Sequence, residues 1–562
     1  MIKALKNSFV ECNGRERAQN LFDEGTYREL LDPFDGLESP HLELQGIVPQ
    51  SDDGVIVAKG TINKQPTVVI SIEGNFQGGG IGEVSGAKIA GALELTLKDC
   101  EAGIKTTPIL VFDTGGVRLQ EANYGLLSIA EIGAAIVALR RHVPVIAVVA
   151  GKIGAFGGMS ITAGLCSSII MTREGRLGLN GPEVIEQEAG IREFDSKNRQ
   201  LIWGTVGGEQ RTATGFADQM IDDDIDDVKA FISSVIDGGI TPVRTEQVKR
   251  YERLLHSVDT TKRLSPEKVR ELWKQSETEL MDDKKHFDMK VDKSTGRGQT
   301  WFDLLRNDCA EVGEVPSVRV ADSFIGETKV RYIVVVPDAN SRFPRARNGE
   351  VGLQEGWSIA KYVREVIEAD KDGEKRAIVP IVDVPSQAYG YHEELLGIHQ
   401  ACAAAVDAYA SARLAGHPVI SFIPGNAISG AFLSHGLQAN RLIALRDSGV
   451  NVHVMSKQSA ARITQRTLKE LEEATQKVPA MAYDIQSFDK LGALYSLVDG
   501  VKADNPEVND RKLIYEAIER AIIDVNMNES KDLSVRLSSA NAKNGGRSAS
   551  ILVREKLSDQ WN

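Results

Sequence analysis

The sequence predicts an α/β fold made of two related halves, each with parallel strands joined by helices. One observation is that the same spaced glycines and aspartate occur twice, with Gly79 and Gly349 lying 270 positions apart. Another is that short apolar, β-branched runs alternate with helical stretches rich in Ala, Leu and Ile in both halves. This alternation is typical of βαβ units with buried parallel strands. We therefore expect two α/β domains related by internal duplication.

The repeat supports the two halves residue by residue. The matches at a spacing of 270 are Gly79 with Gly349, Gly82 with Gly352, Gly86 with Gly356, Ile89 with Ile359, Ala90 with Ala360 and Asp113 with Asp383. Further along, Pro144 matches Pro418 and Gly158 matches Ala431, so the spacing changes by a few residues. Small differences in loop length explain such a change.

The expected elements follow the same order in both halves. In the first half, strands are predicted at Thr67–Ile72, Ile109–Phe112, Val145–Val149 and Ser168–Met171, with helices at Ala87–Leu97 and Leu126–Arg140. In the second half, strands are predicted at Tyr332–Val336, Ile378–Asp383, Val419–Ile423 and Ile443–Leu445. The expected boundaries are a first domain over 1–285, a polar linker over 286–298 and a second domain over 299–562. Ser538–Ser550 has few apolar residues and is expected to be a mobile tail or surface arm.

Composition excludes several classes of protein. The 562 residues carry a formal charge of −13, which counts against broad binding to nucleic acid or to an anionic membrane surface. The most apolar run, Val143–Ala150, is far shorter than the roughly 20 residues of a membrane span. The five cysteines form no C-x-x-C pair, and the nine histidines show no metal-ligand spacing, so neither a disulfide framework nor a metal site is expected. With no signal segment, we expect a cytoplasmic protein.

Two glycine-rich turns in the first half are candidate binding sites. Asp113–Glu121, D-T-G-G-V-R-L-Q-E, follows a predicted strand and contains Gly115 and Gly116. Glycines there allow close backbone approach to a ligand, although a tight turn alone also explains them. Gly157 and Gly158, after the next strand, should stand at a helix N-terminus, where N–H groups and the helix dipole favour negative charge.

The second half offers a counterpart at Gly430 and Ala431. Two such turns suit a reaction in which charge builds up on oxygen, as in a thioester enolate held by an oxyanion hole. Close helix packing without any ligand explains small residues equally well. His435 follows the second turn and is a candidate acid or base, although a lone histidine there is more often structural.

These motifs resemble the carboxyltransferase family. The first turn is similar to that family's D-S-G-G-A-R-x-Q-E element, and Asp383–Gly390, D-V-P-S-Q-A-Y-G, resembles its D-V-P-G-F-x-x-G element. Within the family the likeness is to biotin-independent malonate decarboxylases, with the β and γ subunits fused into one chain. Gly178–Glu183, Ser429–Arg441 and Ser459–Thr464 carry that likeness. Gln387 departs from the family pattern, since many acyl-CoA carboxyltransferases have Phe there.

The resemblance implies a crotonase-like ββα superhelix in each half, with the active site where two halves or two protomers meet. It implies decarboxylation of a malonyl thioester to acetyl thioester and CO₂. The thioester would be carried on the phosphopantetheine-type arm of an acyl carrier subunit, loaded by a separate malonate transferase subunit. The chain would bind no cofactor or metal of its own and would form a homo-oligomer.

The resemblance also implies roles for individual residues. Backbone N–H groups of Gly157 and Gly158, helped by the Gly115–Gly116 turn, would stabilise the enolate oxygen. Those of Gly430 and Ala431 would hold the departing carboxylate. The enolate carbon needs a proton, for which His435, Tyr124 and Glu121 are candidates. Substrate-binding candidates are Arg118, Gln120, Glu121, Tyr124, Gln387 and Tyr389.

Three alternatives remain. A carboxyltransferase would pass the carboxyl group to or from biotin. A hydratase or isomerase of the wider crotonase superfamily would act on free acyl-CoA. A scaffold without activity would only bind the carrier subunit.

Overall fold

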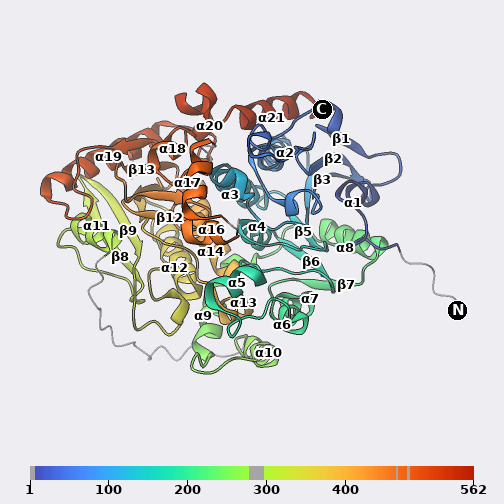
Figure 1. Ribbon diagram of the computed structural model, residues 1–562, viewed down its shortest axis with the longest axis horizontal. Helices are drawn as coiled ribbons and strands as arrows, with labels where there is room; N and C mark the ends of the chain where they lie inside the picture. The colour runs from blue at the N-terminus through green and yellow to red at the C-terminus, as the bar shows by residue number, and fades with distance from the viewer. Residues whose placement is uncertain (1–6, 278–295, 464–465, 478–480) are drawn as a thin grey trace. The chain divides into compact units, whose positions relative to one another are not determined.

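The computed structural model describes residues 7–277, 296–463, 466–477 and 481–562 (Figure 1). The chain forms two units. Unit 1 comprises residues 1–246, 265–273 and 548–562, and unit 2 comprises residues 247–264 and 274–547. Each unit contains one large sheet, and their strand patterns can be compared directly.

Unit 1 contains a seven-stranded sheet whose strands follow in chain order. They are β1 (Arg28–Leu30), β2 (Val55–Ile62), β3 (Gln65–Ile72), β4 (Thr107–Phe112), β5 (Ile146–Val149), β6 (Ser168–Thr172) and β7 (Gln219–Ile221). The pairs β1·β2 and β2·β3 are antiparallel, and every later pair is parallel. The strands β4, β5 and β6 are buried runs rich in Val and Ile, as expected of parallel strands covered on both faces.

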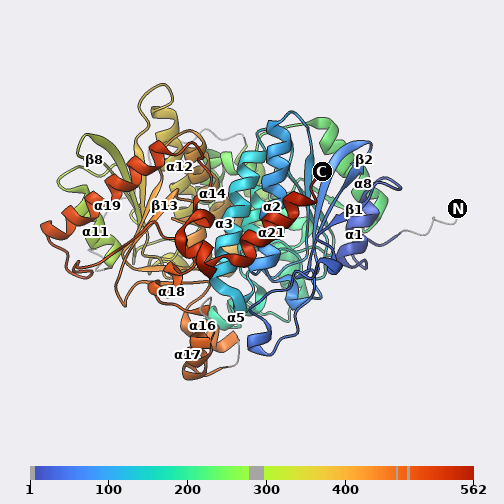
Figure 2. The ribbon, with the colours of Figure 1, turned by 90° about the horizontal axis from the view of Figure 1, so that it is seen from above.

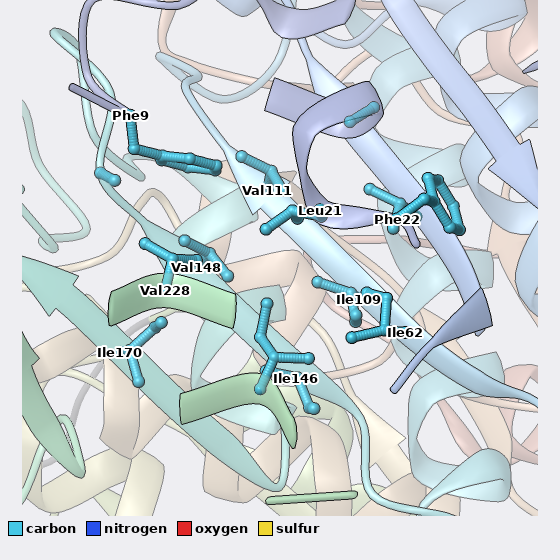
Figure 3. Close-up of a cluster of buried hydrophobic side chains, with 14 of the residues drawn as sticks. Phe9, Leu21, Phe22, Ile62, Ile109, Val111, Ile146, Val148, Ile170 and Val228 are labelled. Carbon is cyan, nitrogen blue, oxygen red and sulfur yellow. The ribbon is translucent and has the colours of Figure 1, made fainter. Parts of the chain in front are cut away.

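Helices cover this sheet. They are α1 (Gly14–Leu21), α2 (Glu83–Glu101), α3 (Ala122–Leu139), α4 (Gly158–Leu165), α5 (Pro182–Ala189), α6 (Arg199–Val206), α7 (Gly208–Ala213), α8 (Ile225–Gly238) and α21 (Ser548–Asp559). Leu21 of α1 and Val228 of α8 pack with Val111, Ile146 and Ile170 of the strands in one buried cluster (Figure 3). Burying each such side chain contributes about 1.5–3 kcal/mol. Helix α21 lies along α2, which also packs on α3 (Figure 2).

Unit 2 has a six-stranded sheet with the order β8-β9-β10-β11-β13-β15. Its strands are β8 (Val318–Ile325), β9 (Thr328–Val335), β10 (Ala377–Ile381), β11 (Ile420–Ile423), β13 (Arg441–Leu445) and β15 (Ser496–Val498). Only β8·β9 is antiparallel, so the pattern equals that of β2 to β7 in unit 1. A separate parallel pair consists of β12 (Asn426–Ile428) and β14 (Asn451–His453).

The helices of unit 2 include the pair α12 (Leu353–Ala369) and α14 (Ile398–Leu414), which pack on each other as α2 and α3 do in unit 1. The others are α9 (Val248–Ser257), α11 (Arg297–Arg306), α13 (Tyr391–Leu395), α15 (Ser429–Ser434), α16 (Lys457–Ile463), α17 (Leu468–Lys477), α18 (Ile485–Asp489), α19 (Val508–Met527) and α20 (Val535–Ser538). Helix α10 (Pro266–Gln275) begins in unit 1 and ends in unit 2.

The predicted strands and helices of both halves are confirmed, each within a longer or slightly shifted element. The antiparallel strands β2 and β8 and the edge strands β1, β7 and β15 were not predicted. Three described segments pack outside the half in which chain order places them, namely 247–264 and 274–277 in unit 2 and 548–562 in unit 1. The predicted linker, 286–298, lies outside the described residues except for its last three positions.

Of the two expectations for Ser538–Ser550, a mobile tail is wrong, whereas a surface arm agrees with the exposure of residues 543–545. Arg547 and Ser550 are completely buried, and Ser550 donates hydrogen bonds from both its N–H and its hydroxyl group to Glu83 of α2. Arg554 forms ion pairs with Glu94 and Glu131. Polar composition misled here because buried hydrogen bonds, together with the ion pairs and the buried Val553 and Leu557 of the helix that follows, hold the end of the chain in place.

One helical stretch among the described residues, Leu119–Leu139, is long and apolar enough to cross a membrane by length and composition alone. Of its most apolar window, 94% is buried inside the protein. A core helix of a globular protein meets the same criteria, so this stretch is weak evidence for a membrane span.

Candidate functional site

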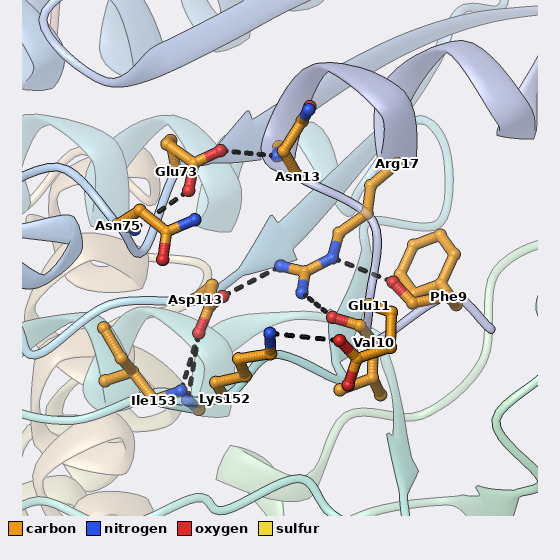
Figure 4. Close-up of polar contacts among 12 residues, drawn as sticks. Phe9, Val10, Glu11, Asn13, Arg17, Glu73, Asn75, Asp113, Lys152 and Ile153 are labelled. Atoms are coloured by element: carbon orange, nitrogen blue, oxygen red, sulfur yellow. Dashed lines mark hydrogen bonds and ion pairs between the residues drawn. The ribbon is translucent and has the colours of Figure 1, made fainter.

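A buried carboxylate at the end of β4 organises the glycine turns of unit 1. Asp113 Oδ1 accepts a hydrogen bond from the N–H of Ile153 at 2.8 Å, and Oδ2 forms an ion pair with Arg17 at 2.9 Å (Figure 4). A Cβ on Gly151 would overlap this carboxylate, so glycine is required there. Asp113 thereby ties the loop that follows β5 to the loop that follows β4, and both candidate turns lie on these two loops.

The two loops then run side by side. Thr114 and Ala155 form a parallel bridge, and the N–H of Phe156 donates to the carbonyl of Thr114 at 3.0 Å. Gly116 and Gly157 have positive φ, at +108° and +56°. A Cβ on Gly116 would lie 3.0 Å from the Cα of Gly157. Both positions therefore need glycine for backbone conformation and for close approach.

Most of the predicted N–H donors in these turns are used by the fold itself, which corrects the expectation. The N–H of Gly115 donates to Gly78, that of Gly116 to the Thr114 hydroxyl group, and that of Gly157 to Leu179, at 2.9 to 3.0 Å. These three groups serve to hold the turns in place. They are therefore not free to bind a substrate oxygen.

The N–H of Gly158 remains, together with one donor that the sequence reasoning missed. Helix α4 begins at Gly158 with Gly157 as its N-cap, as predicted. Within the described residues, the N–H groups of Gly158 and Met159 have no hydrogen-bond partner, whereas that of Ser160 donates to Gly157. The first N–H groups of a helix lack intrahelical acceptors, so the helix start itself was the signal for Met159. The helix dipole adds positive potential at this point.

Unit 2 repeats the arrangement with different residues. Asp383 accepts hydrogen bonds from the N–H groups of Asn426 and Gly298, at 3.0 and 2.9 Å. Val384 and Ala427 form the parallel bridge. The residue with positive φ is Ser429, at +63°.

This geometry corrects the register of the repeat by one residue. Ala427 and Ser429 stand where Ala155 and Gly157 stand in unit 1, so both pairs are 272 positions apart. Gly158 therefore corresponds to Gly430 and not to Ala431. The sequence could not show this because Ser replaces Gly at the residue with positive φ.

Two predicted substrate-binding residues follow β10. The Oε1 atom of Gln387 accepts a hydrogen bond from the N–H of Gly430 at 3.1 Å, and Gln387 is only 6% exposed. Ala431 has no hydrogen-bond partner for its N–H within the described residues. Tyr389 is half-buried two residues further along the same loop.

Arg118 and Glu121 belong to a buried ion cluster, which argues against their expected substrate contacts. Arg118 lies 2.7 Å from Asp53 and 2.6 Å from Glu121, and none of the three side chains is more than 1% exposed. Glu121 also accepts a hydrogen bond from the N–H of Glu83 at the start of α2. Burial raises the pKa of Asp53 to about 6, against the opposing charge of Arg118. The cluster anchors α2 to the turn that contains Arg118.

Tyr124 and Gln120 lie at the edge of this cluster. The Tyr124 ring stacks on His41, with the ring centroids 4.6 Å apart. His41 Nε2 lies 2.7 Å from Glu83, and although burial lowers the pKa of His41, the hydrogen bond and charge of Glu83 outweigh it and raise that pKa. Gln120 is half-buried, and its carbonyl accepts a hydrogen bond from Gln45.

His435 is a structural residue in unit 2. Its Nδ1 lies 3.0 Å from the Tyr409 hydroxyl group, and its Nε2 lies 3.0 Å from the carbonyl of Ile381. It is fully buried, and burial lowers its pKa to about 4. A neutral ring with both nitrogens engaged cannot supply a proton near neutral pH, which argues against His435 as the acid.

Two family descriptions match the chain. Residues 13–292 match the carboxyl transferase domain, and residues 346–561 match the malonate decarboxylase gamma subunit. The chain is 39% identical over 280 residues to the malonyl-S-ACP:biotin-protein carboxyltransferase MADC of Malonomonas rubra, covering 47% of this chain and 88% of that protein. It is 39% identical over 198 residues to MADD of the same organism, covering 34% of this chain and 66% of that protein.

A solved structure of a Pseudomonas malonate decarboxylase hetero-tetramer in complex with malonate is also similar. One of its chains is 56% identical to this one, with 48% of this chain and 97% of that chain covered and a TM-score of 0.47.

The buried neutral state of His435 predicts a pH dependence of stability. Its pKa is about 4 in the folded protein and about 6.5 in the unfolded chain, so only the unfolded chain gains a proton as the pH falls through this window. Stability should therefore fall between pH 7 and pH 5, by roughly 2 kcal/mol from this group. Urea unfolding of His435→Gln should show a correspondingly flatter pH profile.

The control for this experiment is His256→Gln, since the His256 side chain is exposed on α9. The control should keep the wild-type slope. An unchanged slope in His435→Gln would contradict a depressed pKa at His435.

Proposed function

We propose a function from one premise, that the chain belongs to the carboxyl transferase family and carries a malonate decarboxylase gamma-subunit domain in its second half. The chain is an enzyme of malonate catabolism that acts on a malonyl thioester. The C–C bond to the free carboxylate breaks, CO₂ leaves, and the bonding electrons form an enolate. Protonation of the enolate carbon gives the acetyl thioester.

The observation that supports the mechanism is the pair of unpartnered N–H groups at the start of α4. Negative charge in the enolate falls mainly on the thioester oxygen, so the enzyme needs donors placed before the charge develops. Within the described residues, the N–H groups of Gly158 and Met159 have no hydrogen-bond partner and are fixed at the start of α4, so they can act as such donors. One such donor typically stabilises the transition state by about 2.7 to 4 kcal/mol. The other N–H groups of these turns form hydrogen bonds within the protein, which hold the two donors in position.

The proton that completes the reaction has one remaining candidate among the three that the sequence suggested. Glu121 is bound to Arg118, and His435 is neutral and enclosed. Tyr124 is 6% exposed and is stacked on His41. We therefore favour Tyr124 as the proton donor.

Further proposals concern assembly and the substrate carrier. The malonyl group is attached to the phosphopantetheine-type arm of an acyl carrier subunit, and a separate transferase subunit loads it. The chain itself holds no cofactor. The matching strand patterns of β2–β7 and β8–β15 support two crotonase-like domains that arose by duplication of one fold. We place the enzyme in the cytoplasm as a homo-oligomer.

A second candidate function is transfer of the carboxyl group to biotin. The observation that favours it is the 39% identity to two proteins named malonyl-S-ACP:biotin-protein carboxyltransferases. In that reaction the same malonyl thioester loses its carboxyl group, but a biotin nitrogen captures the CO₂.

CO₂ release distinguishes these reactions. The purified full chain should release CO₂ from malonyl-carrier and from malonyl-CoA, with acetyl thioester as the second product, whether or not avidin is present to sequester biotin. Release that disappears with avidin would establish the biotin-dependent reaction. No release from either thioester would contradict decarboxylation by this chain.

Gly157→Ala tests the donors at α4. Gly157 has φ of +56°, and a Cβ there would lie 3.1 Å from the Cα of Gly116, so the turn should shift and carry the Gly158 N–H with it. We expect kcat for CO₂ release to fall at least 100-fold, the usual effect of losing one oxyanion donor. Gly103→Ala is the matched control.

Gly103 also has positive φ, at +90°, but it is exposed after α2 with no atom close enough to meet a Cβ. This control should keep the wild-type kcat although it too places alanine at a residue with positive φ. Equal rates in both variants would remove the assignment to α4.

A further inference from the structure

The two units differ at one position on the loop beside the donor turn. In unit 1, the N–H of Ile81 donates to Gly116 at 2.8 Å, and the N–H of Arg118 donates to Ile81 at 2.9 Å. The residue enclosed by these two hydrogen bonds is Val117, which forms a parallel bridge with Ile81. This pair of bonds defines the place of Val117 in the turn.

The same pair of bonds occurs in unit 2. The N–H of Val351 donates to Ser386, and the N–H of Ala388 donates to Val351, both at 3.0 Å. The enclosed residue is Gln387, in a parallel bridge with Val351. Val117 and Gln387 are therefore structurally equivalent, 270 positions apart.

This difference changes which N–H groups can bind a ligand. Valine has no hydrogen-bond acceptor in its side chain, and the N–H of Gly158 in unit 1 has no partner within the described residues. In unit 2 the side-chain carbonyl of Gln387 accepts a hydrogen bond from the equivalent N–H, that of Gly430. Since Gln387 is almost completely buried, water has little access to compete for this bond.

Transfer of a carboxyl group needs more charge stabilisation than its loss. When a ureido nitrogen of biotin passes its proton to the enolate carbon and attacks CO₂, negative charge develops on the ureido oxygen, which then needs donors of its own. Decarboxylation needs donors only for the thioester oxygen. In unit 2 the N–H of Ala431 alone stays without a partner within the described residues, so only unit 1 offers a pair of adjacent donors. A chain with one such pair is suited to release CO₂, and a chain with two pairs is suited to pass it on.

We propose that Gln387 determines the fate of the carboxyl group. Its side chain accepts the hydrogen bond of the Gly430 N–H, so this N–H cannot stabilise the ureido oxygen of a biotin that accepts the carboxyl group. Gln387 is a positioning residue, and its role rests on the proposed function. The C–C bond of the malonyl group breaks as before, but no N–C bond to biotin forms. CO₂ leaves, and the enolate carbon takes up a proton.

The test measures how the carboxyl carbon is divided between products. Full-length enzyme is supplied with malonyl-CoA labelled in the free carboxyl group and with excess free biotin, and carboxybiotin and CO₂ are both counted. Wild type should give CO₂ with no carboxybiotin above background. Gln387→Val, which copies the residue of unit 1, should increase the ratio of carboxybiotin to CO₂ at least tenfold. This ratio does not depend on how much active enzyme is present.

Two further variants separate hydrogen bonding from packing. Gln387→Glu retains an oxygen acceptor for the Gly430 N–H and should retain the wild-type ratio. Gln387→Leu removes the acceptor at similar volume and should behave as Gln387→Val does. It provides a second test of the lost hydrogen bond if the smaller valine destabilises unit 2. If both apolar variants leave the ratio unchanged, or if wild type already carboxylates biotin, the role of Gln387 is wrong.

The converse substitution, Val117→Gln, introduces an acceptor into unit 1. It should capture the Gly158 N–H and lower kcat for CO₂ release about 100-fold. Unchanged kcat would contradict the equivalence of the two positions. If wild type released no CO₂ from malonyl-CoA or from malonyl-carrier, the proposed function itself would fail, which is a result distinct from an unchanged ratio.

Discussion

The structure of both candidate turns depends on a carboxylate at the end of a central parallel strand, which is buried in unit 1 and half-buried in unit 2. In unit 1, Asp113 ties the loop after β5 through the N–H of Ile153 and is itself held by Arg17 of α1. In unit 2, Asp383 ties the loop after β11 and is held by the N–H of Gly298 at the start of α11. A carboxylate removed from water is costly unless it is hydrogen-bonded or paired, so these donors stabilise the two aspartates where they stand. The turn geometry follows from this requirement.

The turns show how a fold selects which backbone groups are available for chemistry. Gly116 and Gly157 approach each other closely because neither has a side chain. Their N–H groups form hydrogen bonds within the protein that stabilise this close contact. In these turns of unit 1, the donors without a partner within the described residues lie where α4 begins. A glycine-rich motif is thus an indirect sign of a donor site. The glycines shape the turn, while the helix that follows provides the N–H groups.

Much of this architecture could be predicted from sequence, and the failures have physical causes. The apolar runs marked the central strands, and the repeat placed Asp113 and Asp383 correctly because both follow such a run. The start of α4 at Gly158 was also predicted. The partners of individual polar groups were not. Arg118, Glu121 and His435 have side chains that suit catalysis, but their contacts are with residues distant in sequence, which no local pattern reveals. The C-terminal segment was misread for the same reason.

Hydrogen exchange at the acetyl thioester tests the central claim most directly, since it reports the enolate without the loss of CO₂. Acetyl-CoA is incubated with the full chain in D₂O, and deuterium at the methyl group is followed by NMR. If the N–H groups at the start of α4 stabilise the enolate, wild type should catalyse the exchange, and Gly157→Ala should lose it in parallel with kcat. Exchange that is absent in wild type, or equally fast in Gly157→Ala, would contradict the account.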